Sequence, residues 1–91
     1  MGFTQGLATE LGPRNITVNT VSPGFIESQM VDKDASQAVQ YTMLKRIPLR
    51  RMGTVLDVAN AVLFFASEES SYVTGQCLSI SGGLDVSAGI M

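Results

Sequence analysis

The residues best suited to binding a ligand lie where a β-branched stretch ends at Pro23-Gly24. Proline fixes one backbone angle, and glycine lets the backbone approach a flat ligand closely. The amides that follow, together with the Ser28 hydroxyl, could hydrogen-bond an amide or carbonyl group of that ligand. In open α/β sheets, ligands bind beyond the carboxyl ends of parallel strands, so this turn is a candidate binding site. An ordinary strand-to-loop turn can contain the same dipeptide, and that alternative stays open.

Other chemistries are excluded by residue types that these 91 residues lack. The sequence has no histidine, which excludes a Ser-His-Asp triad and His-ligated metal sites within it. Cys77 is the single cysteine, which excludes an internal disulfide and fits a reducing, cytoplasmic setting. We expect Cys77 to be packed within a strand rather than reactive. The net charge of −2 and the lack of a long apolar run argue against nucleic-acid and membrane partners.

The elements that must position the turn alternate between helix and strand. Apolar spacing predicts a helix over residues 2–11, and β-branched residues predict a strand over 16–22 with both faces at least partly buried. A loop over 25–34, a helix over 35–46, a helix over 54–67 and a strand over 77–81 follow, and Gly82-Gly83 ends that strand. Thr54 and Asp57 have the spacing of a capping box.

This order predicts an α/β fold with parallel strands, because helical crossovers favour parallel pairing. Two strands alone make a poor sheet, so further strands are expected from elsewhere. The chain also has a mean hydropathy of +0.24, although so short a sequence buries only about 60–65% of its unfolded surface. We therefore expect part of its apolar surface to face a partner.

Four of the six basic residues fall within seven positions, as Lys45-Arg46 and Arg50-Arg51. Contact with a phosphate-bearing substrate arm or an acidic carrier protein is one interpretation. A solvated helix end, where cations suit the helix dipole, is the other.

Several blocks of this sequence resemble the C-terminal portion of the classical short-chain dehydrogenase/reductase family, and most closely its 3-oxoacyl-(acyl-carrier-protein) reductase group. The blocks are Gly2-Phe3-Thr4 with residues 7–11, residues 16–24, Arg51-Met52-Gly53-Thr54 with residues 57–59 and 61–67, and residues 72–76 with Gly82-Gly83. Ser81 stands where the family more often has Asp. Tyr41-x-x-x-Lys45 matches the family's catalytic spacing but follows the Pro-Gly turn instead of preceding it, so we interpret it as a chance match.

The resemblance implies that residues 1–91 are the C-terminal part of a Rossmann-type, doubly wound parallel sheet. It also implies NAD or NADP as cofactor and hydride transfer to or from a carbonyl. Pro23 and Gly24 would lie against the nicotinamide, the Ile26 backbone would bond its carboxamide, and Ser28 would replace the usual Thr. Residues 25–52 would cover a small carbonyl, alcohol or acyl-thioester substrate. The family's catalytic Ser, Tyr and Lys have no counterpart here, so we expect no catalytic residue in this chain and no activity from it alone.

The resemblance further implies a homo-oligomer formed through helix 54–67 and strand 77–81. A second interpretation belongs to another class of protein: a non-catalytic truncated relative that acts as an oligomerisation or interaction module. A third is a truncated product with no function of its own.

Overall fold

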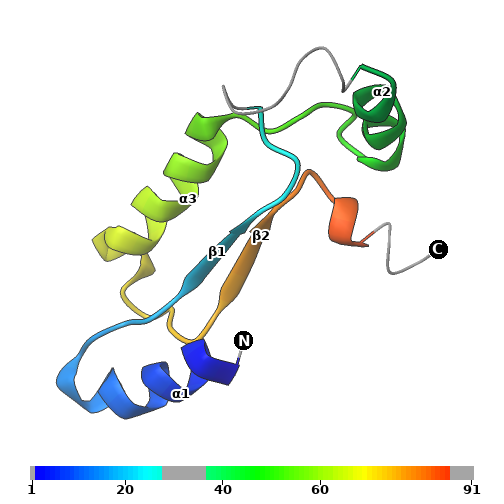
Figure 1. Ribbon diagram of the computed structural model, residues 1–91. Helices are drawn as coiled ribbons and strands as arrows, with labels where there is room; N and C mark the ends of the chain where they lie inside the picture. The colour runs from blue at the N-terminus through cyan, green and yellow to red at the C-terminus, as the bar shows by residue number, and fades with distance from the viewer. Residues whose placement is uncertain (1, 28–36, 87–91) are drawn as a thin grey trace.

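The computed structural model describes residues 2–27 and 37–86 (Figure 1). Its helices are α1 (Gly2–Leu11), α2 (Gln37–Arg46) and α3 (Val55–Ala66), its strands are β1 (Thr20–Pro23) and β2 (Cys77–Ile80), and single 3₁₀ turns cover Gly12–Arg14 and Glu68–Ser70. The order of helices and strands is the predicted one. α1 has the predicted bounds, and Pro13 lies in the 3₁₀ turn that ends it.

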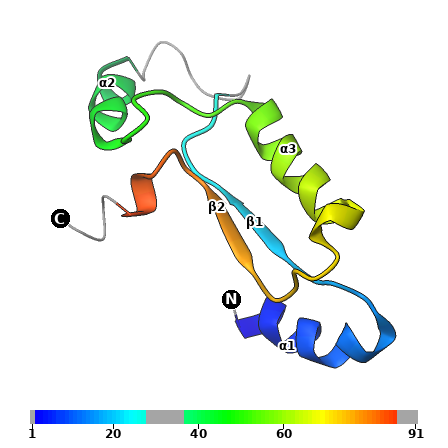
Figure 2. The same cartoon turned by 180° about the vertical axis from the view of Figure 1, so that it is seen from behind.

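The two strands pair in parallel, as predicted, and α3 lies on the crossover between them. Thr20 is opposite Cys77 and Pro23 is opposite Ile80, so both strands end at the same edge. Figures 1 and 2 show α3 running alongside the strands, with α1 near their beginning and α2 beyond their end. This arrangement brings the Pro23 turn, the segment after α2 and the start of α3 to one place.

β1 begins four residues later than the predicted strand over 16–22. Val18 instead bonds to the turn before β2: its N–H donates to Thr74 Oγ1 at 2.9 Å, and its carbonyl accepts from Gly75 at 2.7 Å. The Asn19 side chain makes two more bonds to that turn, donating to the Val73 carbonyl and accepting from the Gln76 N–H. Side-chain bonds are therefore mixed with backbone bonds here instead of a regular ladder, and β-branched composition alone does not reveal this.

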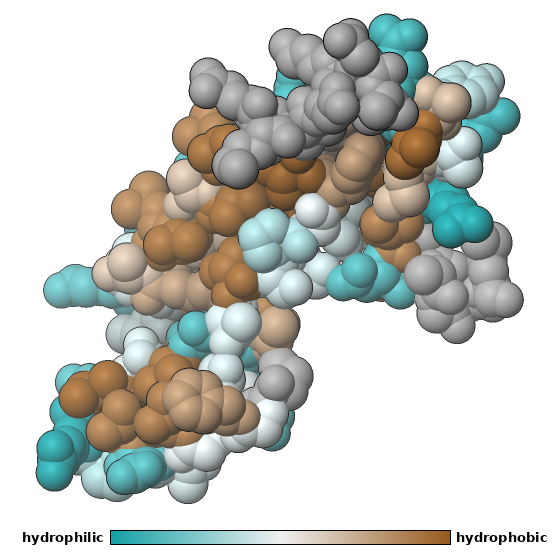
Figure 3. All heavy atoms as spheres, viewed as in Figure 1, coloured by the Kyte–Doolittle hydropathy of each residue, from teal (hydrophilic) through white to brown (hydrophobic). Residues whose placement is uncertain are grey.

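Little apolar surface is buried among the described residues. Only Ala8 and Ile47 are buried hydrophobic residues there, and α3 has no buried residue. Leu56 and Leu63 on α3 are each 66% exposed. Figure 3 shows apolar side chains gathered along α3. The apolar surplus predicted from composition thus lies at the surface of the described residues. The first strand was predicted to be at least partly buried on both faces: Val18 and Val21, on opposite faces, are half-buried, and Ile16 is 45% exposed.

Cys77 lies in β2 as predicted but is exposed, so its predicted packing is wrong for this structure. The reason is that β2 has one neighbour, β1, in the described two-stranded sheet. Within residues 2–27 and 37–86, none of the helices has the length and hydropathy to span a membrane.

Candidate functional site

The candidate site is built at the shared carboxyl end of β1 and β2. Backbone pairing continues one residue past Pro23, because the Gly24 N–H donates to the Ile80 carbonyl at 2.9 Å. A Cβ on Gly24 would lie 2.9 Å from the Cβ of Ser81 and 3.0 Å from its Cα. Glycine is therefore required here by the close approach of the two strand ends, whatever else binds at the turn.

Ile26 follows the turn and forms an isolated parallel bridge with Gly53. The Gly53 N–H donates to the Phe25 carbonyl at 3.0 Å, and the Glu27 N–H donates to the Gly53 carbonyl at 2.8 Å. In a parallel bridge, one residue bonds both chain neighbours of its partner through its own N–H and carbonyl. Here Gly53 bonds Phe25 and Glu27, the neighbours of Ile26, and the N–H and carbonyl of Ile26 itself point the other way. The Ile26 backbone groups therefore face away from Gly53. The sequence predicted only a loop here, and residues 26 and 53 share no local pattern that could have revealed the bridge.

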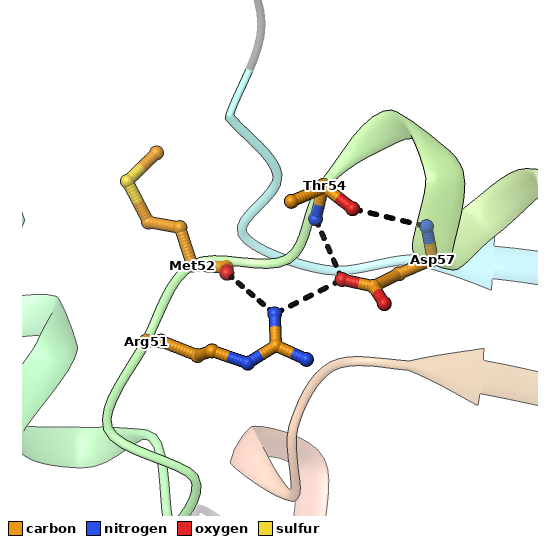
Figure 4. Close-up of polar contacts among 4 residues, drawn as sticks. All are labelled: Arg51, Met52, Thr54 and Asp57. Carbon is orange, nitrogen blue, oxygen red and sulfur yellow. Dashed lines mark hydrogen bonds and ion pairs between the residues drawn. The ribbon is translucent and has the colours of Figure 1, made fainter.

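Polar contacts clamp the segment that contains Gly53 onto the start of α3 (Figure 4). Thr54 caps the helix: its Oγ1 accepts from the Asp57 N–H at 3.1 Å, and its own N–H donates to Asp57 Oδ2 at 2.8 Å. This is the predicted capping box. Arg51 Nη1 adds two bonds that were not predicted, to Asp57 Oδ2 at 3.0 Å and to the Met52 carbonyl at 3.1 Å.

These contacts favour the charged carboxylate of Asp57. The Arg51 hydrogen bond, followed by the bonds from Thr54, lowers the pKa of Asp57 from 3.8 to about 2. A carboxyl group whose pKa is lower in the folded state stabilises the fold above its unfolded pKa, and loses that contribution as pH falls through the folded value.

We therefore expect the Asp57 contribution to be fully present at pH 5 and above, and to disappear as pH falls from about 3.8 towards about 2. NMR titration of the side-chain carboxyl carbon would measure the folded pKa directly. Asp57→Asn is the matched control, since it keeps an oxygen acceptor and cannot titrate. A midpoint near 3.8 in the folded chain would contradict the role given to Arg51 and Thr54.

The segment after α2 is anchored to the turn that follows β2. Ile47 is 1% exposed, and the Leu49 N–H donates to the Gly82 carbonyl at 3.2 Å. Gly82 and Gly83 have φ values of +65° and +94°, and a Cβ on them would lie 2.8 Å from Ile47 Cγ2 and Pro48 Cγ respectively. The predicted Gly82-Gly83 turn is thus needed both for its backbone conformation and for close packing.

A hollow of about 280 Å³ lies between this anchor and the start of α3. Its lining residues are Leu49, Arg51, Gly53, Asp57, Ser79, Ile80, Ser81 and Gly82. The lining of this hollow includes Arg51, Gly53 and Asp57 but not Ile26.

The basic cluster is partly engaged in local contacts. The Arg50 guanidinium donates to the Lys45 carbonyl at the end of α2, and Lys45 Nζ lies 4.5 Å from the centre of the Tyr41 ring. Arg51 is paired with Asp57. These contacts favour the helix-end interpretation for Lys45 and Arg50. Tyr41 and Lys45 lie on α2, after the turn, in keeping with a chance match to the catalytic spacing.

Three of the four predicted binding residues, Pro23, Gly24 and Ile26, lie together at the end of β1. Ser28 falls outside the described residues. Within the described part of the chain, no group of three or more His, Cys, Asp or Glu side chains could hold a metal ion. Among the described residues, the predicted site thus consists of the Pro23-Gly24 turn and the backbone groups of Ile26.

Two parallel strands joined by a helical crossover, with a glycine turn at their carboxyl end, are typical of a Rossmann-type sheet. The family described as enoyl-(acyl carrier protein) reductase matches residues 1–85. The chain belongs to the short-chain dehydrogenase/reductase family.

Similar proteins agree with this membership. The chain is 54% identical over 84 residues to a 3-oxoacyl-(acyl-carrier-protein) reductase of Thermotoga maritima, a match that covers 92% of the chain and 34% of the relative. A solved 3-oxoacyl-(acyl-carrier protein) reductase of Brucella melitensis is 43% identical with a TM-score of 0.86, over 91% of this chain and 31% of that one. A solved 2-deoxy-D-gluconate 3-dehydrogenase homologue of Agrobacterium tumefaciens, with bound NADP, is 35% identical with a TM-score of 0.85, over 93% and 35%. The chain thus spans about a third of the length of its relatives.

Proposed function

We propose that these residues form the nicotinamide end of the cofactor site of an NAD(P)-dependent oxidoreductase that interconverts a carbonyl and an alcohol. The observation that carries the proposal is the pair of Ile26 backbone groups directed away from Gly53 beside the Pro23-Gly24 turn. A neighbouring structure holds NADP, and relatives are named as reductases. The bound nicotinamide would supply or accept the hydride.

The residues present fit such a group. The carboxamide of nicotinamide offers one acceptor and one donor, which match the N–H and carbonyl of Ile26. Pro23 and Gly24 would support one face of the ring, since neither side chain carries a polar group that competes for hydrogen bonds there. The Ser28 hydroxyl would give a further bond to the carboxamide. The task of this chain is then to orient the ring while the proton donor comes from residues outside it.

The segment after β1, residues 25–52, would cover the substrate. Its far end is anchored at Ile47 and Leu49 against Gly82. We propose a small carbonyl or alcohol, or an acyl thioester, as the substrate class. One relative is named for reduction of a 3-oxoacyl group on a carrier protein.

We propose that α3 and β2 form the contact between two copies of the complete protein. Leu56 and Leu63 are each 66% exposed, and Leu78 on β2 is 42% exposed. The same exposed surface favours a second candidate function, an interaction module that docks on intact relatives. A pull-down of an intact relative by the purified 91-residue chain would support that alternative.

The test is a chimera in which these 91 residues replace the matched C-terminal segment of the Thermotoga relative. If the turn orients nicotinamide, the chimera should bind NADPH or NADH and reduce a 3-oxoacyl thioester, with kcat/KM within about tenfold of the relative, or about 1.4 kcal/mol. Absorbance at 340 nm follows the turnover.

The 91-residue chain alone serves as the control and should show no turnover above a blank. A folded chimera that binds neither dinucleotide would contradict the proposed function. Turnover by the chain alone would contradict the expectation that the proton donor lies outside it.

A further inference from the structure

The two peptide groups on either side of Gly53 are each held from both ends. In the first, the Met52 carbonyl accepts from Arg51 Nη1 at 3.1 Å, and the Gly53 N–H donates to the Phe25 carbonyl at 3.0 Å. In the second, the Gly53 carbonyl accepts from the Glu27 N–H at 2.8 Å, and the Thr54 N–H donates to Asp57 Oδ2 at 2.8 Å. A peptide group is planar, so fixing both its ends fixes its orientation.

Arg51 and Asp57 hold the outer ends of these two groups and are bonded to each other at 3.0 Å. A single guanidinium nitrogen, Nη1, joins the Met52 carbonyl to the Asp57 carboxylate (Figure 4). A helix cap by itself needs only Thr54 and Asp57. The added arginine bonds reach back along the chain to the peptide that faces Phe25. The ion pair thus does more than begin a helix.

We propose that Arg51 and Asp57 are a positioning pair, which acts through the two peptide groups of Gly53 to hold the Phe25–Glu27 backbone so that the Ile26 N–H and carbonyl face the ligand. The assignment of that ligand as nicotinamide rests on the proposed function above. The positioning itself rests on the hydrogen bonds. The chain of contacts runs from the pair to Gly53 and from Gly53 to both neighbours of Ile26.

Hydrogen exchange of backbone amides in the chimera, with no dinucleotide bound, tests the positioning without any cofactor. Arg51→Met should accelerate exchange at the Gly53 and Glu27 amides by about tenfold, because local opening controls their protection. Amides in the middle of α3, such as those of Val62 and Leu63, should change less than about twofold. Asp57→Asn keeps an acceptor for the Thr54 N–H but weakens the bond to Arg51, so it should give a smaller acceleration at the same two amides.

Arg50→Met is the matched control, since the Arg50 guanidinium bonds the Lys45 carbonyl rather than the Met52 carbonyl or the Asp57 carboxylate. It should leave the Gly53 and Glu27 amides unchanged. Unprotected Gly53 and Glu27 amides in the folded, unmodified chimera, or equal acceleration in α3 and at these two amides, would overturn the positioning role.

A second measurement tests whether the Arg51–Asp57 pair affects the affinity for the dinucleotide. In the chimera, Arg51→Met should raise the Kd for NADPH about tenfold, while Arg50→Met should leave it unchanged. If the unmodified chimera binds no dinucleotide, the proposed function fails although the exchange result stands. If the unmodified chimera binds the dinucleotide, and Arg51→Met changes neither the Kd nor the exchange rates, the positioning role of Arg51 and Asp57 is contradicted and the proposed function stands.

Discussion

Replacing Gly24 by alanine is expected to force apart the ends of the two strands. The added Cβ would lie 2.9 Å from the Cβ of Ser81, 3.0 Å from its Cα and 3.3 Å from the Ile80 carbonyl oxygen. Two of these atoms belong to the backbone, so a side-chain rotation cannot relieve the contact. Overpacking of this kind costs about 1–3 kcal/mol of folding free energy. If the turn also supports the nicotinamide, affinity for NADPH should fall by about tenfold or more.

Urea unfolding and dinucleotide titration of the Gly24→Ala chimera would measure both effects. Gly6→Ala is the matched control, since a Cβ at this exposed helical position would meet nothing within 4 Å. It should stabilise by about 0.5–1 kcal/mol through helix propensity. Adding Ser81→Gly to Gly24→Ala should restore part of the loss, because it removes the nearest clashing atom. A Gly24→Ala protein as stable as its parent would contradict the close approach.

Truncating Ile47 to alanine is expected to release the segment between α2 and α3 from the end of β2. Ile47 is 1% exposed, and its Cγ2 lies against the Gly82 backbone. Removing a buried isoleucine side chain down to Cβ costs about 2–5 kcal/mol, including the cavity that is left. The Leu49 N–H bond to the Gly82 carbonyl should weaken with it, since the same packing holds both segments.

Denaturant unfolding of the chimera, together with exchange at the Leu49 amide, would measure this loss. Val39→Ala is the control, because Val39 lies on α2 and is 58% exposed. Its effect should stay within about 0.5 kcal/mol. Equal effects of the two substitutions would show that Ile47 does not anchor the segment.

Local patterns in the sequence predicted the helices well. α1 has the predicted bounds, and the Thr54–Asp57 capping box forms as its spacing indicated. Both features depend on residues only a few positions apart, where spacing fixes geometry. The parallel pairing of β1 and β2 was also predictable, because a helical crossover restricts the direction of the second strand.

Contacts between distant residues were not predictable. The Ile26–Gly53 bridge joins residues that share no period, and the Gly24–Ser81 contact joins the ends of two strands. The first strand was predicted from Ile16 because β-branched residues begin there. In the structure, Val18 and Asn19 bond to the turn before β2 through side chains as well as backbone. Whether a residue joins a strand ladder or bonds through side chains depends on which groups of the other segment lie opposite it, and that is known only in the folded structure.

The sequence by itself determined the order of elements, the helix cap and the family, since these follow from neighbouring residues and ordered motifs. It also placed the turn at Pro23 and Gly24. Only the tertiary structure showed why Gly24 must be glycine and which way the Ile26 backbone groups face. It alone joined Arg51 and Asp57 to that backbone through Gly53. The physical reason is that hydrogen bonds and close packing act between groups that folding brings together, and their direction is fixed only once both partners are in place.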